Sequence, residues 1–244
     1  MGGLCLITGA SSGIGAAVAR MAAARGYDVA IIYHSNRAGA EAVAADVRAA
    51  GQTALLCPGD VATPEGVAAI FAQIDSHGAP LTALVNNAGV VDLPARVTEM
   101  THARLRRMFD INVIGAILVA KEAVLRMQDR GGAIVNISSA AARLGSGGQY
   151  VDYAASKAAI DIFTKGLSDE VAASGIRVNA IRPGLIDTEI HAKGGLPDRA
   201  QKLAHMVPMK RTGTAEEVAE AVLWLMSDAA AYVTGAVLDV SGGR

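Results

Sequence analysis

Short apolar runs alternate with longer segments of helical periodicity along this chain. The first apolar run covers residues 4–8, and further strand-like runs are expected at residues 28–33, 53–57, 81–86, 132–138, 176–181 and 236–240. After the first run, apolar residues recur at the spacing of one helix face, at Ile14, Val18, Met21 and Ala22. Regular alternation of strands and helices predicts an α/β fold, a doubly wound parallel sheet of seven strands.

Three longer segments between the strands are expected to be helical, at residues 38–50, 101–130 and 214–227. The second carries an apolar side formed by Leu105, Met108, Phe109, Ala116, Val119 and Ala123, and Asn112 falls in the middle of that side. A buried amide without a partner costs about 1–3 kcal/mol. Asn112 is therefore expected either to be bonded by neighbouring groups or to face a functional site, and the pattern leaves both open.

Length and composition favour one domain. A chain of 244 residues with 52% hydrophobic composition can supply a large core, and no linker or internal repeat divides it, so we expect a single domain over residues 1–244. The stretch 185–211 is polar and is interrupted by Gly194, Gly195, Pro197 and Pro208. So long a segment without a clear packed element is more often a functional lid than a connector, and we expect a substrate lid there.

Charge and composition exclude several functional classes. The net charge is −1 and no run of Lys or Arg marks a phosphate-tracking surface, so nucleic-acid binding is not expected. No apolar run has membrane-spanning length and the start has no leader pattern, which favours a cytoplasmic location. Cys5 and Cys57 fall in apolar strand-like runs and are expected to be buried side chains; with the strand order that the family resemblance below implies, another strand separates theirs and no disulfide is expected. No His/Cys cluster has zinc-ligand spacing, and no metal is expected.

A glycine-rich turn, Thr8-Gly9-Ala10-Ser11-Ser12-Gly13-Ile14-Gly15, joins the first strand to the first helix. Glycines in this position let the backbone approach a pyrophosphate, which the free amides of the helix N-terminus attract. The turn predicts a dinucleotide site with contacts from Gly9, Ser11, Ser12, Gly13, Ile14 and Gly15.

The end of the second strand bears on the choice of cofactor. In doubly wound sheets an acidic residue there binds the ribose 2′-hydroxyl of NAD, whereas an arginine accommodates the 2′-phosphate of NADP. This chain has Ser35, Asn36 and Arg37 at that place and no carboxylate. The residues favour NADP over NAD, with an exposed arginine at a helix start as the structural alternative.

Tyr153 and Lys157 lie four residues apart in an alanine-rich helical segment, which places both on one helix face. The same face continues through Ile160, Leu167 and Val171, so the lysine falls on a side expected to pack against a core. A nearby cation favours the phenolate and lowers the pKa of a tyrosine from its usual value of about 10. The pair is therefore a candidate general acid/base.

These residues together resemble the short-chain dehydrogenase/reductase family over essentially the whole chain. The family's motifs occur in order as Thr8-Gly9-x-x-x-Gly13-Ile14-Gly15, Asp60, Asn86-Asn87-Ala88-Gly89, Asn112, a serine after the fifth strand, Tyr153-x-x-x-Lys157, and Pro183-Gly184 with Thr188. The resemblance implies a Rossmann fold with strand order 3-2-1-4-5-6-7, a nicotinamide cofactor and a homotetramer.

The resemblance also implies a role for each matching residue. Tyr153 would give a proton to the substrate carbonyl oxygen as hydride arrives, and Lys157 would lower the pKa of Tyr153 and bind the nicotinamide ribose. Ser139 would polarise the carbonyl oxygen, and Asn112 would hold a water that connects Lys157 to solvent. Further cofactor contacts would come from Tyr153 itself and from Asp60, Val61, Asn86, Ala88, Gly89, Pro183, Gly184, Ile186 and Thr188.

Two departures from the family pattern affect these assignments. Members commonly place the serine thirteen residues before the tyrosine, where this chain has Ala140, while Ser139 lies fourteen before Tyr153. We infer a one-residue insertion between Gly145 and Asp152, with Ser138 as the alternative serine. Tyr150 competes with Tyr153, but Ala154 rather than a lysine follows it by four residues. NADP-preferring relatives also often carry a basic residue where this chain has Ser12.

Two functions follow from these residues. The first is an NADP-dependent carbonyl reductase or alcohol dehydrogenase. The alternative is a non-catalytic dinucleotide-sensing or scaffold protein, which would be expected to lack part of the Asn112, Ser139, Tyr153 and Lys157 set. The substrate would be a small carbonyl or alcohol compound, free or bound to acyl carrier protein. Arg126 and Arg130 could help such a carrier dock, or could simply complement a helix dipole.

Overall fold

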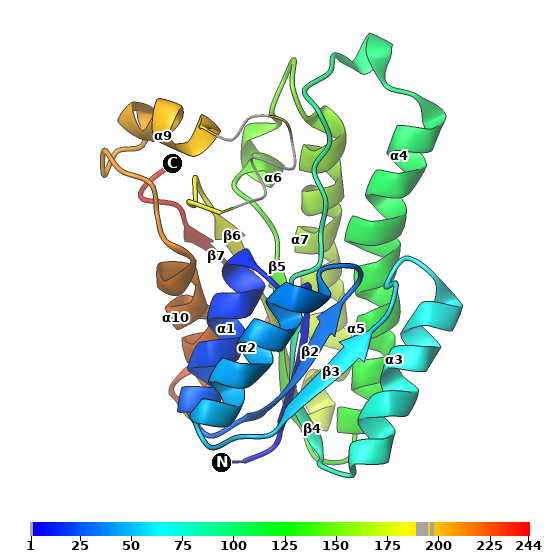
Figure 1. Ribbon diagram of the computed structural model, residues 1–244. Coiled ribbons are helices and arrows are strands. Elements are labelled where there is room, and N and C mark those ends of the chain that lie inside the picture. The colour runs from blue at the N-terminus through cyan, green and yellow to red at the C-terminus, as the bar shows by residue number, and fades with distance from the viewer. Residues whose placement is uncertain (1, 189–194, 196–197) are drawn as a thin grey trace.

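The computed structural model describes residues 2–188, 195 and 198–244. A single sheet of seven parallel strands crosses the molecule in the order β3-β2-β1-β4-β5-β6-β7 (Figure 1). The strands are β1 Leu4–Thr8, β2 Asp28–Tyr33, β3 Ala54–Pro58, β4 Leu81–Asn86, β5 Gly132–Ile137, β6 Ile176–Pro183 and β7 Val237–Val240. Both the fold class and the strand order implied by the sequence are confirmed.

Helices cover both faces of the sheet (Figure 1). One face packs against α1 Gly13–Ala24, α2 Arg37–Ala49 and α10 Ala215–Met226, whose buried side chains form one apolar cluster with the strands. The other face packs against α3 Pro64–His77, α5 Ala116–Met127 and α7 Val151–Val171, and α4 His102–Phe109 extends this layer beside α7. Two short helices, α6 Ala141–Leu144 and α9 Arg199–Leu203, lie beyond the carboxyl ends of the strands. Parallel strands buried on both faces explain why the sequence shows continuous apolar runs rather than alternation.

The expected helix over residues 101–130 has an interruption that its periodicity did not predict. Between α4 and α5, Asp110–Gly115 forms a π-helical turn. Gly115 permits this turn to lie against the segment after β3, because a Cβ there would stand 2.7 Å from the Val61 carbonyl oxygen. A π-turn inserts one extra residue into the helix and is frequent at functional sites.

Several smaller expectations can be compared with the structure. Cys5 and Cys57 are both buried, and β2 separates their strands as expected. Strand β6 runs two residues further than expected, to Pro183. The expected lid over residues 185–211 lies partly outside the described residues. Within the described part of the chain, no helix is long and apolar enough to span a membrane.

Candidate active site

A cleft of about 450 Å³ opens at the carboxyl ends of the central strands. Its lining includes these residues expected from the sequence: Ile14, Gly89, Ser139, Tyr153, Lys157, Pro183, Gly184, Ile186 and Thr188. They come from the ends of strands β4, β5 and β6, from the start of α1 and from α7. Open α/β sheets bind their ligands at this edge, so the fold brings together residues that are up to 174 positions apart, from Ile14 to Thr188.

The glycine turn is held in place by the end of β4. The Thr8 hydroxyl oxygen accepts hydrogen bonds from the backbone amides of Asn87 and Ala88, each at 2.9 Å. The Asn87 side-chain amide donates to the carbonyl oxygens of Thr8 at 2.9 Å and Gly9 at 3.1 Å. Gly9 has φ +64°, in the left-handed region, and a Cβ on Gly15 would lie only 2.5 Å from the Asn87 amide nitrogen. Only glycine fits both positions, which leaves the backbone and the N-terminus of α1 open to a pyrophosphate.

Lys157 is buried beside Tyr153. Its ammonium donates to the Ile137 carbonyl oxygen at 2.7 Å, at the end of β5, and lies 5.8 Å from the centre of the Tyr153 ring. Burial lowers the pKa of Lys157 to about 8, and the negative charge of Asp161 acts in the opposite direction. Tyr153 and Lys157 both line the cleft, as the helical spacing predicted, and the lysine lies on the packed side of α7.

Asn112 sits at the π-turn with its side chain fully engaged. Its carbonyl oxygen accepts from the Val90 amide at 2.8 Å, and its amide nitrogen lies 3.0 Å from the Val90 carbonyl oxygen and 3.1 Å from the Ser156 hydroxyl. A Cβ on Gly89 would stand 3.3 Å from both the Asn112 side-chain oxygen and the Lys157 ammonium. The structure therefore satisfies the Asn112 side chain through neighbouring groups, the first of the two alternatives, whereas Asn112 is not among the described residues that line the cleft and its role in a functional site stays a prediction.

The two serines after β5 have different environments. The Ser138 hydroxyl is buried and donates to the Lys157 carbonyl oxygen at 3.1 Å. The Ser139 hydroxyl accepts from the Ala141 amide at 3.1 Å, an arrangement in which its own hydrogen can be donated into the cleft. This difference favours Ser139 as the serine that contacts a substrate. Tyr150 also lines the cleft but is 5% exposed, and buried Ala154 follows it by four residues.

A sequence model of the family described as enoyl-(acyl carrier protein) reductase matches residues 9–244. The chain belongs to the short-chain dehydrogenase/reductase family. It is 50% identical over 245 residues to "uncharacterized oxidoreductase YgfF" of Escherichia coli, with 99% of each chain covered. It is 41% identical to "cis-4-hydroxycyclohexanecarboxylate dehydrogenase" of Sinomonas cyclohexanicum, covering 98% of this chain and 95% of that one.

A solved structure that contains a bound cofactor is also similar to this chain. The blue fluorescent protein from a metagenomic library, determined in complex with NADPH, matches with a TM-score of 0.90 and 35% identity, over 99% of this chain and 97% of that one. The protein is thus a member of a family of oxidoreductases. From the glycine turn, Ile14 lines the cleft, and a Cβ on Gly13 would stand 3.6 Å from the Thr188 side chain, so the turn lies beside the residues after β6.

In this short-chain dehydrogenase/reductase, the two asparagines at the end of β4 bind different partners. The Asn86 amide is buried and donates to the Ala116 carbonyl oxygen at 3.0 Å and to the Asn136 side chain at 3.1 Å. Asn87 holds the glycine turn and lines the cleft. Sequence reasoning selected Asn86 for cofactor support and missed Asn87. The signal was present, because Asn87 belongs to the same four-residue motif.

The residues expected at the adenosine end lie after β2 and β3. Ser35, Asn36 and Arg37 are exposed, and Arg37 pairs with Glu41 at 2.7 Å one helical turn later. The Asn36 side chain caps α2 by accepting from the Gly39 amide at 3.1 Å and reaches the Ser11 carbonyl oxygen in the glycine turn at 3.4 Å. The Asp60 carboxylate accepts from the Ala62 amide at 2.9 Å, and Val61 is buried. Asp60 thus has the local bond of a turn aspartate, and its contact with adenine stays a prediction.

The low pKa of Lys157 makes stability depend on pH. Between about pH 8 and pH 10.5 the unfolded lysine holds a proton that the folded one has lost, so the free energy of unfolding should rise with pH in this window. Below about pH 8 both states are protonated and the cost of burial is constant. At ~1.4 kcal/mol per pH unit, the gain is on the order of 3 kcal/mol.

The measurement is urea unfolding of the cofactor-free protein at both ends of this window, with Lys157→Met beside the wild type. Burial raises the pKa values of the Cys5 and Cys57 thiols, so their contribution to the free energy of unfolding falls as pH rises. Wild type and Lys157→Met both carry these thiols, so this contribution cancels in the difference between the two proteins. Wild type should gain stability relative to Lys157→Met as pH rises. A constant difference between the two proteins would contradict the depressed pKa.

Proposed function

We propose that this protein reduces a carbonyl compound, or oxidises the corresponding secondary alcohol, with Tyr153 as general acid/base and NADP as the preferred cofactor. One observation carries the proposal. Tyr153, Lys157 and Ser139 line the same cleft, and the lysine is fixed there by its 2.7 Å bond to the Ile137 carbonyl oxygen. The non-catalytic alternative gains no support, since Ser139, Tyr153 and Lys157 line the cleft and Asn112 bonds to Val90 and Ser156 behind it.

The proposed chemistry divides between the cofactor and the chain. When bound, the nicotinamide supplies hydride to the carbonyl carbon or accepts it from the alcohol carbon. Ser139 donates a hydrogen bond to the carbonyl oxygen, which orients and polarises it. Tyr153 gives its phenolic proton to that oxygen in reduction and takes it back in oxidation.

Lys157 and Asn112 support this proton transfer. The Lys157 ammonium favours the phenolate of Tyr153, because opposite charges attract and the lysine is itself buried. Asn112 fixes Val90 and Ser156, and Ser156 in turn donates to the Tyr153 carbonyl oxygen at 2.7 Å. This chain of bonds ties the π-turn to the first turns of α7. In this proposal Asn112 also holds the water that links Lys157 to solvent.

The first test is oxidation of NADPH and NADH with a panel of carbonyl compounds. The panel contains 4-oxocyclohexanecarboxylate, a β-ketoacyl thioester and an uncharged cyclic ketone, since one relative is named for a hydroxycyclohexanecarboxylate. Turnover that is faster with NADPH and disappears in Tyr153→Phe supports the proposal. Cofactor binding without turnover of any compound, or equal turnover in the variant, speaks against it.

Arg37 provides the test of cofactor preference. Arg37→Gln should raise the KM for NADPH by about tenfold, because a charge-assisted bond to the 2′-phosphate is lost, and should leave the KM for NADH unchanged. Arg48→Gln, which removes an exposed arginine at the other end of α2, is the matched control. If both KM values change together in Arg37→Gln, the residue does not select the phosphate.

A free small molecule is favoured over a carrier-bound substrate. Arg126, one of two arginines that could bind an acidic carrier, is already engaged with Asp75 at 2.6 Å and with Glu122 at 2.8 Å. Its charge is largely compensated within the chain, which weakens a basic docking patch.

A homotetramer in the cytoplasm completes the proposal. Exposed apolar side chains, Leu105, Ile114, Ile117, Leu125 and Ile162, lie on the layer formed by α4, the π-turn, α5 and α7 and suit a subunit interface. Light scattering in solution tests this, and a monomer would contradict it.

A further inference from the structure

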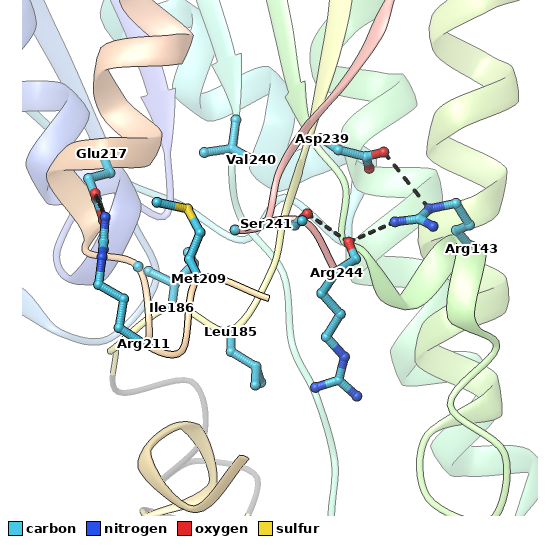
Figure 2. Close-up of a pocket in the computed structure, with 13 residues that line it drawn as sticks. Arg143, Leu185, Ile186, Met209, Arg211, Glu217, Asp239, Val240, Ser241 and Arg244 are labelled. Atoms are coloured by element: carbon cyan, nitrogen blue, oxygen red, sulfur yellow. Dashed lines mark hydrogen bonds and ion pairs between the residues drawn. The ribbon is translucent and has the colours of Figure 1, made fainter. Parts of the chain in front are cut away.

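The segment after β7 brings an arginine to the active-site cleft. Arg244 lines that cleft and also lines a second cavity of about 560 Å³, which shares Leu185 and Ile186 with it. Figure 2 shows the second cavity and the Arg244 side chain, which extends away from Asp239 and Arg143 towards the side of Leu185. Arg244 therefore stands where the two cavities meet.

The backbone of this segment is firmly held. The Arg244 main-chain oxygen accepts from the Arg143 guanidinium at 2.7 Å and from the Ser241 hydroxyl at 2.6 Å (Figure 2). The turn at Ser241 also packs closely on the cleft wall, because a Cβ on Gly184 would lie 2.7 Å from the Ser241 Cα. The main chain of Arg244 is thus held by Arg143 of α6, the helix that follows Ser139, and by Ser241, which packs against Gly184 just after β6.

The guanidinium of Arg244 has no acidic partner in the described part of the chain. The ion pairs around the second cavity join Arg143 to Asp239 and Arg211 to Glu217. Among the described residues that line the cleft, the charged ones are Lys157 and Arg244, and both are cations. Arg244 is half-buried and faces a cleft whose described lining has no carboxylate, so its guanidinium is suited to bind a negatively charged ligand.

The phosphates of the cofactor are not the natural partner of this cation. The glycine turn follows β1, whereas Arg244 follows β7, four strands away in the sheet. At about 4.8 Å per strand, β1 and β7 are separated by roughly 19 Å in the sheet. Ser139 follows β5, which lies between these two strands in the sheet, and Tyr153 lines the same cleft from α7. Arg244 is therefore on the substrate side of the cleft.

We propose that Arg244 binds a carboxylate of the substrate, so that the preferred substrate is a carbonyl or hydroxy compound that carries an acid group. The inference rests on the proposed function in taking this cleft as the substrate site. Arg143 acts as a positioning residue, because it holds the Arg244 main chain rather than the ligand.

The test compares binding of 4-oxocyclohexanecarboxylate and its methyl ester to the protein loaded with NADP, measured by calorimetry. The ketone cannot be reduced by the oxidised cofactor, so binding is measured without turnover and is independent of the role of Tyr153. Wild type should bind the carboxylate about 10- to 100-fold more tightly than the ester, as expected for a charge-assisted bond. Arg244→Met should remove this preference, and Arg244→Lys should keep part of it.

Two further variants separate the ligand contact from general effects. Arg211→Gln removes a similar charge from the second cavity and should keep the full preference. Arg143→Gln should reduce the preference by releasing the Arg244 main chain. An equal preference in Arg244→Met and wild type, no preference in wild type, or an increase in the Kd for NADP in Arg244→Met would each overturn the proposal. If Tyr153→Phe stays active while the preference depends on Arg244, the proton-transfer role fails and this inference stands.

Discussion

Replacement of Tyr153 by phenylalanine is expected to lower kcat by about 10²- to 10⁴-fold, the usual contribution of a positioned general acid. Only the hydroxyl is removed, so the ring continues to line the cleft beside Lys157. The Kd for NADPH should change little, because the glycine turn and α1 are untouched. The measurement is steady-state turnover of the best panel compound together with cofactor binding by fluorescence.

Tyr150→Phe is the matched control for this experiment. Tyr150 also lines the cleft, but Ala154 follows it by four residues where Lys157 follows Tyr153. We therefore expect a much smaller decrease in kcat from Tyr150→Phe than from Tyr153→Phe. A larger decrease in kcat from Tyr150→Phe than from Tyr153→Phe would assign the proton transfer to Tyr150. If both variants had the kcat of wild type, neither tyrosine would be the general acid.

The fold could be predicted because both faces of the sheet are covered. Strands buried on two faces appear as continuous apolar runs, and the helices between them carry one apolar side. The limits of β2 and β4 agree with the sequence to the residue. The π-turn could not be predicted in this way, since it depends on Asn112 meeting Val90 and Ser156, which lie 22 and 44 positions away.

The candidate site could be predicted in outline but not always to the residue. Where a strand ends, neighbouring side chains point in different directions, so Asn86 and Asn87 serve different partners, as do Ser138 and Ser139. The sequence alone identifies the two asparagines and the two serines, but not the direction in which each side chain points. Arg244 could not be found at all, because its position depends on Arg143, 101 positions earlier in the chain.

The buried ion pair of Arg104 and Asp152 should be the costliest single contact to break outside the cleft. Arg104 donates to the two carboxylate oxygens at 2.7 Å and 3.3 Å and to the Leu93 carbonyl oxygen at 2.7 Å. The Asp152 side chain is 0% exposed, and its bond raises the pKa of Arg104. Arg104→Met would leave a buried carboxylate unpaired, so we expect a loss of about 3–5 kcal/mol in the free energy of unfolding.

Two comparisons make this expectation specific. Arg106, on the same helix, pairs with Asp110 but is 61% exposed, so Arg106→Met should cost less than about 1 kcal/mol. Combining Arg104→Met with Asp152→Leu should recover most of the loss, because no unpaired charge then remains buried. Urea unfolding of the four proteins measures both effects. Equal losses in the two single arginine variants would show that burial of Asp152 does not control the energy.

The same pair links stability to catalysis. Asp152 precedes Tyr153 in the first turn of α7, while Arg104 and Leu93 belong to α4 and to the segment after Val91, which lines the cleft. An unpaired Asp152 would therefore disturb the start of the helix that carries the phenol. In Arg104→Met, kcat should decrease along with stability, and the double variant should restore stability more fully than kcat, because it lacks the bond that holds Leu93 to α4.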